Sequence, residues 1–468
     1  MDAETFSVVS GRAAYRHDDP PNLDKVIRRL IWAYFFLLLF EGAIRKWFLP
    51  SSLSPAMAVI RDPLLMYIYW LAFRSGKLPT SPFVISCGVL AVLSFLAGLM
   101  PDRNTLFVDL YGARTNFLHM PFIFLLPKFF SAKDVVRMGR WCLLIMIPVS
   151  FLMVYQFLSP PDAWINKASS EEASQISGGV GKVRPPGIFT FATGAAEFSA
   201  LCAVFLIYGT MFRSTYPKAL LVAGGIALAA GMSSSISRLN ITSVGIVVLC
   251  LLLFNCMRPG FVPRFIPFFI LGVIAFVVLL QLPSIRQGLD AFSDRINDAS
   301  ASEGGHLGFI HRVTGIFTEA YSDTLWDGPI EGRGLGMGTN AGSRLLTGKD
   351  SYLLSEGEWQ RITLESGPVL GTLYLLWRVV LVLWLGRRSL GFAYRAQPLP
   401  LLLFGACTPL ILIGQLGRPT TLGFTVMDAA LCVAAMNAPE AIRSRPVVPV
   451  GRRVFRRGSA QYREAASL

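Results

Sequence analysis

Carboxylate and guanidinium side chains are closely spaced in residues 355–367, which read Ser-Glu-Gly-Glu-Trp-Gln-Arg-Ile-Thr-Leu-Glu-Ser-Gly. Glu358, Arg361 and Glu365 follow one another at three- and four-residue intervals, so they share one face if the segment is helical. We expect Glu356 to start this helix. A carboxylate beside arginines can act as a general base, which makes Glu356 a candidate catalytic residue. In the alternative interpretation these acids only cap a helix N-terminus.

Arginines are the second chemical feature, because several stand near the predicted outer ends of apolar segments. A guanidinium group binds two phosphate oxygens with its planar fork and stays charged. Arginines between apolar helices therefore suit an anionic headgroup on an apolar tail, such as a lipid-linked diphosphate. The candidates are Arg114, Arg184, Arg238 and Arg361. Alternatively, each arginine pairs with a nearby carboxylate or reaches lipid phosphate.

The other charges of the apolar segments lie mostly near the same predicted end. They are Glu41, Arg45, Lys46, Arg61, Asp62, Glu197 and Arg418. Only Asp428 is deep, with Arg378 a turn or two below the predicted outer surface. An ion path would need carboxylates through the middle of the membrane, so this one-sided layer favours a reaction at the outer interface. We expect Arg45 to pair with Glu41, and Arg61 with Asp62.

Two motifs stand at predicted helix ends and offer further phosphate donors. Arg184-Pro-Pro-Gly-Ile-Phe-Thr-Phe-Ala-Thr-Gly194 precedes an apolar run, and Ser233-Ser-Ser-Ile-Ser-Arg238 places serines beside an arginine. Hydroxyl, amide and guanidinium groups all donate to phosphate, which makes Arg184 and Arg238 candidate catalytic residues. Each motif is also what a simple helix boundary looks like.

A glycine-rich run occupies residues 328–338 and reads Gly-Pro-Ile-Glu-Gly-Arg-Gly-Leu-Gly-Met-Gly. A dinucleotide site would need a strand before the glycines and a cytosolic ligand, and the sequence indicates neither. Two interpretations are left, a loop over the active site or backbone amides that form an anion nest. Gly334 and Gly336 therefore join Arg114, Arg361 and Glu358 as candidate substrate-binding residues.

Neither a metal nor a cofactor is expected. The sequence has no Asp-x-Asp cluster, and its seven cysteines fall inside or at the ends of apolar segments without CxxC spacing. That pattern favours small buried side chains over a zinc site or a disulfide framework.

The composition predicts an all-α, polytopic membrane protein, because 53% of residues are hydrophobic and only 15% are charged. A spanning helix needs about 20 mostly apolar residues. Twelve candidate spans meet that length approximately: 30–49, 55–73, 83–100, 107–127, 141–158, 189–212, 218–236, 240–257, 265–282, 366–386, 398–415 and 420–437. The first 29 residues are too polar for a signal peptide, so we expect the first span to stay as an anchor.

The distribution of Lys and Arg predicts the orientation. Alternating spans from a cytoplasmic N-terminus place most of the 43 basic residues in short cytoplasmic segments. The predicted organisation is a cytoplasmic tail (1–29), membrane helices 1–9 (30–282), a large periplasmic loop with amphipathic helices (283–365), membrane helices 10–12 (366–437) and a basic cytoplasmic tail (438–468). The scattered basic residues and the lack of a binding motif argue against a nucleic-acid partner, despite a net charge of +14.

The whole chain resembles the O-antigen ligase and O-antigen polymerase superfamily of bacterial membrane glycosyltransferases. The resemblance covers the span layout and the large outer loop. Arg184-Pro-Pro-Gly-Ile-Phe is similar to the family's Arg-x-x-Gly-x-Phe, Ser235-Ile-Ser-Arg238 to its Ser-x-Ser-Arg, and Gly332-Arg-Gly-Leu-Gly336 to its Gly-x-Gly. Residues 356–371 look like a stretch that in many members reads His-Asn, then an apolar run, then Glu-x-Gly. This chain has Glu356 at the position where many ligases carry histidine.

The resemblance implies an enzyme of the bacterial inner membrane with both termini in the cytoplasm. Its donor would be an oligosaccharide on undecaprenyl diphosphate, and its acceptor another glycan or a lipid, within surface polysaccharide biosynthesis. In this chain Glu356 would take the role of the family histidine. Ligase and polymerase activity are both open, because the histidine is absent. Two other classes are alternatives: a flippase or transporter for lipid-linked oligosaccharide, and a non-catalytic subunit of a polysaccharide assembly complex.

Overall fold

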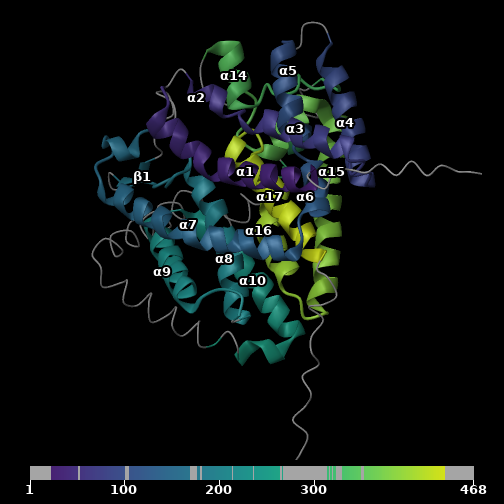
Figure 1. Cartoon of the computed structure of the whole chain (residues 1–468). Helices are drawn as coiled ribbons and strands as arrows, with labels where there is room; N and C mark the ends of the chain where they lie inside the picture. The colour runs from purple at the N-terminus through teal and green to yellow at the C-terminus, as the bar shows by residue number, and fades with distance from the viewer. Residues whose placement is uncertain are drawn as a thin grey trace, which may run out of the picture.

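The structure is a computed structural model. It describes residues 23–50, 53–100, 105–168, 177–179, 182–212, 214–235, 237–263, 266, 314–315, 317–318, 320–322, 329–348 and 353–437. These residues form a bundle that is helical almost throughout, which confirms the all-α class (Figure 1). Most of the predicted span 265–282, of the first part of the large loop and of both tails lies outside the described residues.

The elements, in chain order, are α1 (Leu23–Ala43), the π-helix η1 (Ile44–Phe48), α2 (Ser54–Met57), α3 (Arg61–Arg74), α4 (Pro82–Gly98), α5 (Leu106–Ala113), the π-helix η2 (Arg114–Leu118), α6 (Phe122–Phe129), α7 (Ala132–Leu158), η3 (Trp164–Asn166), the paired short strands β1 (Ser177–Gly179) and β2 (Lys182–Val183), α8 (Ala192–Met211), α9 (Lys218–Ser234), α10 (Arg238–Met257), η4 (Pro259–Phe261), α14 (Asn340–Thr347), α15 (Glu358–Ala393), α16 (Leu399–Ile413) and α17 (Pro419–Met436).

Five of the described helices are long and apolar enough to cross a membrane: α7, α8, α10, α15 and α17. Helices α4, α9 and α16 are apolar but shorter. The predicted segments 55–73 and 107–127 are helical but broken, the first between α2 and α3. In the second, α5 passes through the π-helix η2 and α6 begins after Pro121, whose ring removes a backbone donor.

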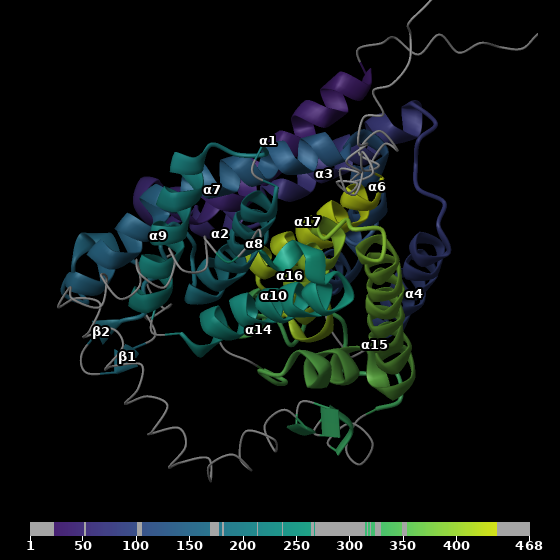
Figure 2. The ribbon, with the colours of Figure 1, turned by 90° about the horizontal axis from the view of Figure 1, so that it is seen from below.

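Helix α15 consists of two arms that fold back on each other at Gly367. This glycine has φ 75° and ψ 169°, which is not helical, and Pro368 follows it. Glu358 and Arg378 would lie about 30 Å apart along a straight helix of that length. Their side chains instead form an ion pair of 2.9 Å. The second arm runs beside α4 in both Figure 1 and Figure 2, where the Trp377 indole donates to the Phe83 carbonyl over 3.1 Å.

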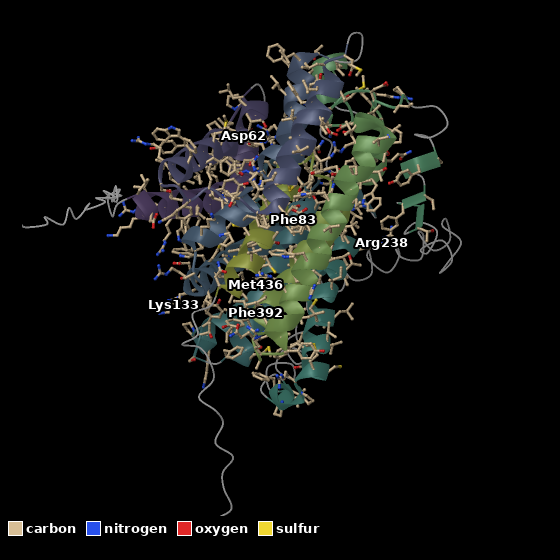
Figure 3. All side chains as sticks on the ribbon, turned by 90° about the vertical axis from the view of Figure 1, so that its right-hand side faces the viewer. Asp62, Phe83, Lys133, Arg238, Phe392 and Met436 are labelled. Atoms are coloured by element: carbon tan, nitrogen blue, oxygen red, sulfur yellow. The ribbon has the colours of Figure 1, made fainter. Side chains whose placement is uncertain are left out.

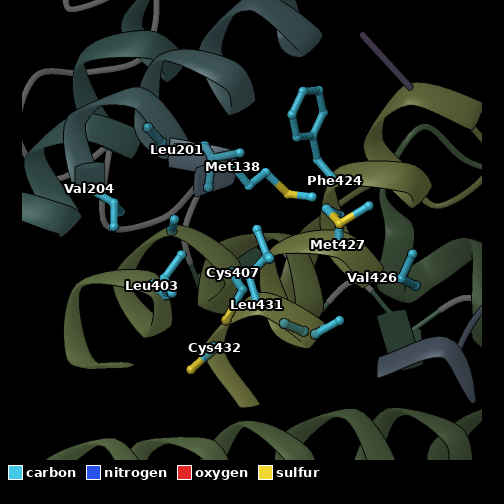
Figure 4. Close-up of a cluster of buried hydrophobic side chains, with 14 of the residues drawn as sticks. Met138, Leu201, Val204, Leu403, Cys407, Phe424, Val426, Met427, Leu431 and Cys432 are labelled. Atoms are coloured by element: carbon cyan, nitrogen blue, oxygen red, sulfur yellow. The ribbon is translucent and has the colours of Figure 1, made fainter. Parts of the chain in front are cut away.

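Helix α17 lies at the centre of the bundle, with nearly all of its residues buried. It contacts α6, α7, α8, α15 and α16. Figure 4 shows its side chains Phe424, Met427 and Leu431 packed with Met138 of α7 and Leu201 of α8. An apolar surface buried on this scale drives a bundle to one arrangement and leaves the polar residues to pair at the helix ends.

Contacts between distant segments gather at two ends of the bundle. At one end, Lys77 pairs with Asp24 (2.7 Å), Lys128 donates to the Leu78 carbonyl (2.8 Å) and Asn437 donates to the Pro127 carbonyl (2.9 Å). At the other end lie the buried charges of α1, α3, η2 and the start of α15. Figure 3 shows Asp62 toward this second end, and Lys133, Phe392 and Met436 toward the first.

Candidate functional site

The first arm of α15 carries a buried network of four charged side chains. Arg361 bonds Glu358 through Nε (3.0 Å) and Glu365 through Nη1 (2.7 Å), and Arg378 bonds Glu358 (2.9 Å). Each of the four residues is at most 4% exposed. The prediction that Glu358, Arg361 and Glu365 share a helix face is confirmed. Two carboxylates balance two guanidinium groups, which offsets the cost of burying these charges.

Two other segments complete this network. Asn116, in the π-helix η2, accepts a hydrogen bond of 2.9 Å from Arg361 through its Oδ1 atom. The backbone amide of Gly338 donates to Glu365 Oε1 over 2.9 Å. A π-turn places its side chains out of helical register and is frequent at functional sites. The sequence signal for Asn116 was a polar residue within a predicted span, but nothing in it indicated Arg361 as the partner.

The glycine-rich run packs against the bend of α15. The amides of Arg333 and Gly334 donate to the carbonyls of Leu364 (2.9 Å) and Glu365 (3.1 Å), which the bend leaves without helical partners. Gly334 and Gly336 have φ 113° and 78°, a region that favours glycine. A side chain on Gly336 would also overlap the backbone of α5. These contacts give both glycines a packing role, and their predicted role in substrate binding stays a prediction.

A pocket opens in front of this network, and about 270 Å³ of space there, open solvent included, is not filled by atoms. Its lining comes from three segments: the loop that leads into α14, the start of α15 and the turn between α16 and α17. The lining residues are Gly338, Thr339, Asn340, Ser355, Glu356, Glu358, Arg361, Gln415, Gly417 and Arg418. Glu356, Glu358 and Arg361, three of the predicted site residues, thus come together in one pocket.

Glu356 differs from the nearby Glu358 because it is exposed. The prediction that it starts the helix is wrong, since α15 begins at Glu358 with Gly357 as its N-cap. Ser355 forms the local turn instead and accepts from the Gly357 amide over 2.9 Å. The Glu356 carbonyl accepts from Gln415 Nε2 over 2.8 Å, which ties this segment to the turn after α16. Within the described residues its carboxylate lines the pocket and forms no ion pair with an arginine.

The turn between α16 and α17 supplies lining residues that sequence reasoning missed as part of a site. Gln415 and Arg418 belong to Gln415-Leu-Gly-Arg-Pro419, a short turn between two apolar segments. An amide and a guanidinium in so short a turn were a signal of a polar environment. The Arg418 guanidinium also lies over the Phe191 ring, 5.2 Å from its centroid, at the start of α8.

A second charged network lies behind the first, around Asp62. Arg45 pairs with Glu41 (3.4 Å), as predicted. The predicted pair of Arg61 with Asp62 is wrong: Arg61 bonds Glu41 (3.0 Å), because adjacent residues on a helix do not face each other. Asp62 accepts instead from Arg114 and lies 2.9 Å from His119 Nε2.

The four predicted phosphate-binding arginines therefore occupy different environments. Arg114 and Arg361 are paired with carboxylates, the alternative that the sequence left open. Arg184, after β2, has a buried Nε atom with no hydrogen-bond partner in the described part of the chain. Arg238 is the first residue of α10 and half-buried, and Figure 3 places it on a different side of the molecule from Asp62. Arg114, Arg184 and Arg238 are not among the residues that line the pocket.

The serines before Arg238 bond their own helix. The hydroxyl groups of Ser233, Ser234 and Ser235 donate to carbonyls of the preceding turn of α9. These hydrogen bonds agree with the interpretation that the motif is a simple helix boundary. Within the described ranges no three His, Cys, Asp or Glu side chains are grouped to hold a metal ion.

Comparisons with family models, with curated proteins and with solved structures find no match to this chain. The geometry of the pocket and of the charged networks, together with the resemblance in the motifs, therefore carries the functional proposal.

Proposed function

We propose that this protein is a membrane glycosyltransferase that transfers or polymerises glycans carried on a polyprenyl diphosphate, at the outer face of the bacterial inner membrane. The observation that carries the proposal is the pocket at one end of an apolar bundle, with the exposed Glu356 at its rim. A base at a membrane surface, beside hydroxyl and amide groups, suits a substrate whose sugar is polar and whose carrier is apolar.

The proposed topology has about twelve spans, both termini in the cytoplasm and the large loop in the periplasm. Two features support it. The described helices include five that are long and apolar enough to cross. The contacts at one end of the bundle join segments that the Lys and Arg bias assigns to the cytoplasm, including Lys77 with Asp24 and Lys128 with Leu78.

In the proposed reaction an acceptor hydroxyl attacks the anomeric carbon of the donor sugar. A new bond forms between that carbon and the acceptor oxygen, and the bond to the diphosphate oxygen breaks. Glu356 takes the hydroxyl proton, and the lipid diphosphate leaves with the bonding electrons. Arg184 and Arg238 stabilise the departing diphosphate by charge-assisted hydrogen bonds. The buried Nε of Arg184, which has no partner among the described residues, supports its part in this role.

The test is reconstitution of the purified protein in liposomes with lipid-linked oligosaccharide and a glycan or lipid acceptor. The wild-type protein should release free lipid diphosphate and yield transferred or longer glycan. Glu356→Gln should lower the rate by about 10²- to 10⁴-fold. Arg184→Ala and Arg238→Ala should abolish transfer, and Lys77→Ala, at the other end, should leave it unchanged. Full activity of Glu356→Gln would exclude Glu356 as the base.

One observation favours the flippase alternative. Asp428 is 0% exposed in the middle of α17, and neither carboxylate oxygen has a hydrogen-bond partner among the described residues. Buried carboxylates within membrane segments often serve transport. The same liposomes separate the two functions, because a flippase moves labelled lipid between leaflets without changing the glycan or releasing diphosphate.

A further inference from the structure

We infer that the pocket in front of α15 binds a neutral sugar of the acceptor through its hydroxyl groups, and that the diphosphate of the donor lies outside it. This inference rests on the proposed function and names the ligand of its site. It replaces the expectation that Arg361 binds phosphate.

The charges of the pocket do not suit a diphosphate. Its charged lining residues are two glutamates and two arginines, Glu356, Glu358, Arg361 and Arg418. Arg361 already directs Nε and Nη2 to Glu358, Nη1 to Glu365 and Nη2 also to Asn116. A guanidinium has five N–H donors, so about one is left for a ligand. An anion with at least two charges would meet a lining without net positive charge.

The polar groups of the pocket suit a ligand that donates hydrogen bonds. Gln415 Nε2 donates to the Glu356 carbonyl (2.8 Å), while the Gln415 Oε1 atom is buried without a partner in the described part of the chain. A buried acceptor left unpaired is costly, so a ligand that donates to it gains affinity. The Glu356 carboxylate is a second acceptor. Sugar hydroxyls donate, whereas ionised phosphate oxygens only accept.

The remaining lining groups include one further amide beside these acceptors. Asn340 contributes its amide, whereas the hydroxyl groups of Thr339 and Ser355 already bond within the chain. In this arrangement one hydroxyl reaches Gln415 and a second reaches Glu356, and the second is the nucleophile of the transfer.

Protection of a cysteine in the pocket tests this inference. Six of the seven native cysteines are buried and Cys256 is exposed, so Ser355→Cys is made in a Cys256→Ser background. The probe is a polar maleimide on the full-length protein in detergent, with a panel of neutral methyl glycosides and with inorganic pyrophosphate as competitors. At least one glycoside should slow labelling several-fold in a saturable manner, and pyrophosphate should not.

A matched pair of glutamine variants tests which side chain accepts the hydrogen bond from the sugar hydroxyl. Gln415→Met removes the hydrogen-bond acceptor Oε1. This variant should weaken protection by the glycoside about tenfold, equivalent to about 1.4 kcal/mol. Gln397→Met is the control, because Gln397 Oε1 is also buried without a described partner but lies outside the pocket. This control should leave protection unchanged.

Protection by pyrophosphate, or by no glycoside of the panel, would overturn the inference. So would equal protection in Gln415→Met and the parent. These outcomes are separable from failure of the proposed function. If glycan transfer occurs while pyrophosphate protects Ser355→Cys, the enzyme assignment stands and the sugar pocket fails. If a glycoside protects but no glycan is transferred, the pocket stands and the enzyme assignment fails.

Discussion

The arginines of this protein show that a side chain's chemistry depends on whether a carboxylate already neutralises it. Arg61, Arg114 and Arg361 all stand where the sequence predicts a charged layer, and all three form ion pairs with acids of the same layer. A paired guanidinium gives position and rigidity but little net charge. At this scale Glu356 differs from the arginines because it is exposed, although it lies only two positions from the buried Glu358.

The different environments of Glu356 and Glu358 predict opposite effects of a Glu→Gln substitution on stability and on transfer activity. Glu358→Gln removes the charge that two buried guanidinium groups share and should cost about 3–5 kcal/mol of unfolding free energy. Glu356→Gln should leave stability unchanged and lower the transfer rate by about 10²- to 10⁴-fold. Thermal unfolding in detergent and the liposome assay together measure both effects. A Glu358→Gln protein as stable as the parent would mean that the network contributes nothing to the fold.

Asp428 provides a different test, because it is an ionisable core residue whose replacement should not destabilise the protein. Both carboxylate oxygens are buried without a described partner, so replacing them by methyl groups of the same branching removes an uncompensated cost. We expect Asp428→Leu to unfold at the same or a higher temperature than the parent. Asp134→Leu is the control: Asp134 closes the capping box of α7 with Ser131, and its loss should cost about 0.5–2 kcal/mol. A marked loss of stability in Asp428→Leu would contradict the argument.

At the scale of elements, local patterns were predictable and long-range contacts were not. The spacing of Glu358, Arg361 and Glu365 predicted their shared face, because helical periodicity is a local property. Their contact with Asn116 depends on how α15 packs against η2, more than two hundred residues earlier in the chain. The polar residues that interrupt segment 107–127 have the same explanation, since Arg114, Asn116 and His119 all bond within the networks. Their type signalled a site, but their partners required the fold.

Two glycines of α15 provide a matched test of its bend. Gly367 has φ 75° and ψ 169°, and a side chain there would overlap the carbonyl of Ile330. Gly367→Ala should cost about 1–3 kcal/mol and separate the arm with Glu358 from the arm with Arg378. Gly391→Ala, on the same helix with open space around it, should gain about 0.5–1 kcal/mol. The measurements are thermal unfolding and glycan transfer, and equal effects of the two variants would contradict the bend.

The whole molecule has two chemically different ends. One end carries the Asp62 network, the α15 network and the pocket, while the other carries exposed basic residues such as Lys77 and polar contacts to backbone carbonyls. The hydropathy of the chain predicted a polytopic protein, and the Lys and Arg bias predicted its orientation. Neither pattern could show that α14, α15 and the turn before α17 together line the pocket, because these segments meet only once the helices pack.

Thiol labelling from one side of the membrane tests the orientation on which the enzymatic proposal depends. Leu345 is 59% exposed on α14, whose first residue lines the pocket, and Thr80 is exposed just after Lys77 and Leu78, which form contacts at the opposite end. In a Cys256→Ser background, a membrane-impermeant maleimide added to cells with a permeabilised outer membrane should label Leu345→Cys and not Thr80→Cys. Thr80→Cys should become reactive only after the inner membrane is lysed. The reverse pattern would place the pocket in the cytoplasm, where glycan transfer would face the wrong compartment, even though every contact within the bundle would be unchanged.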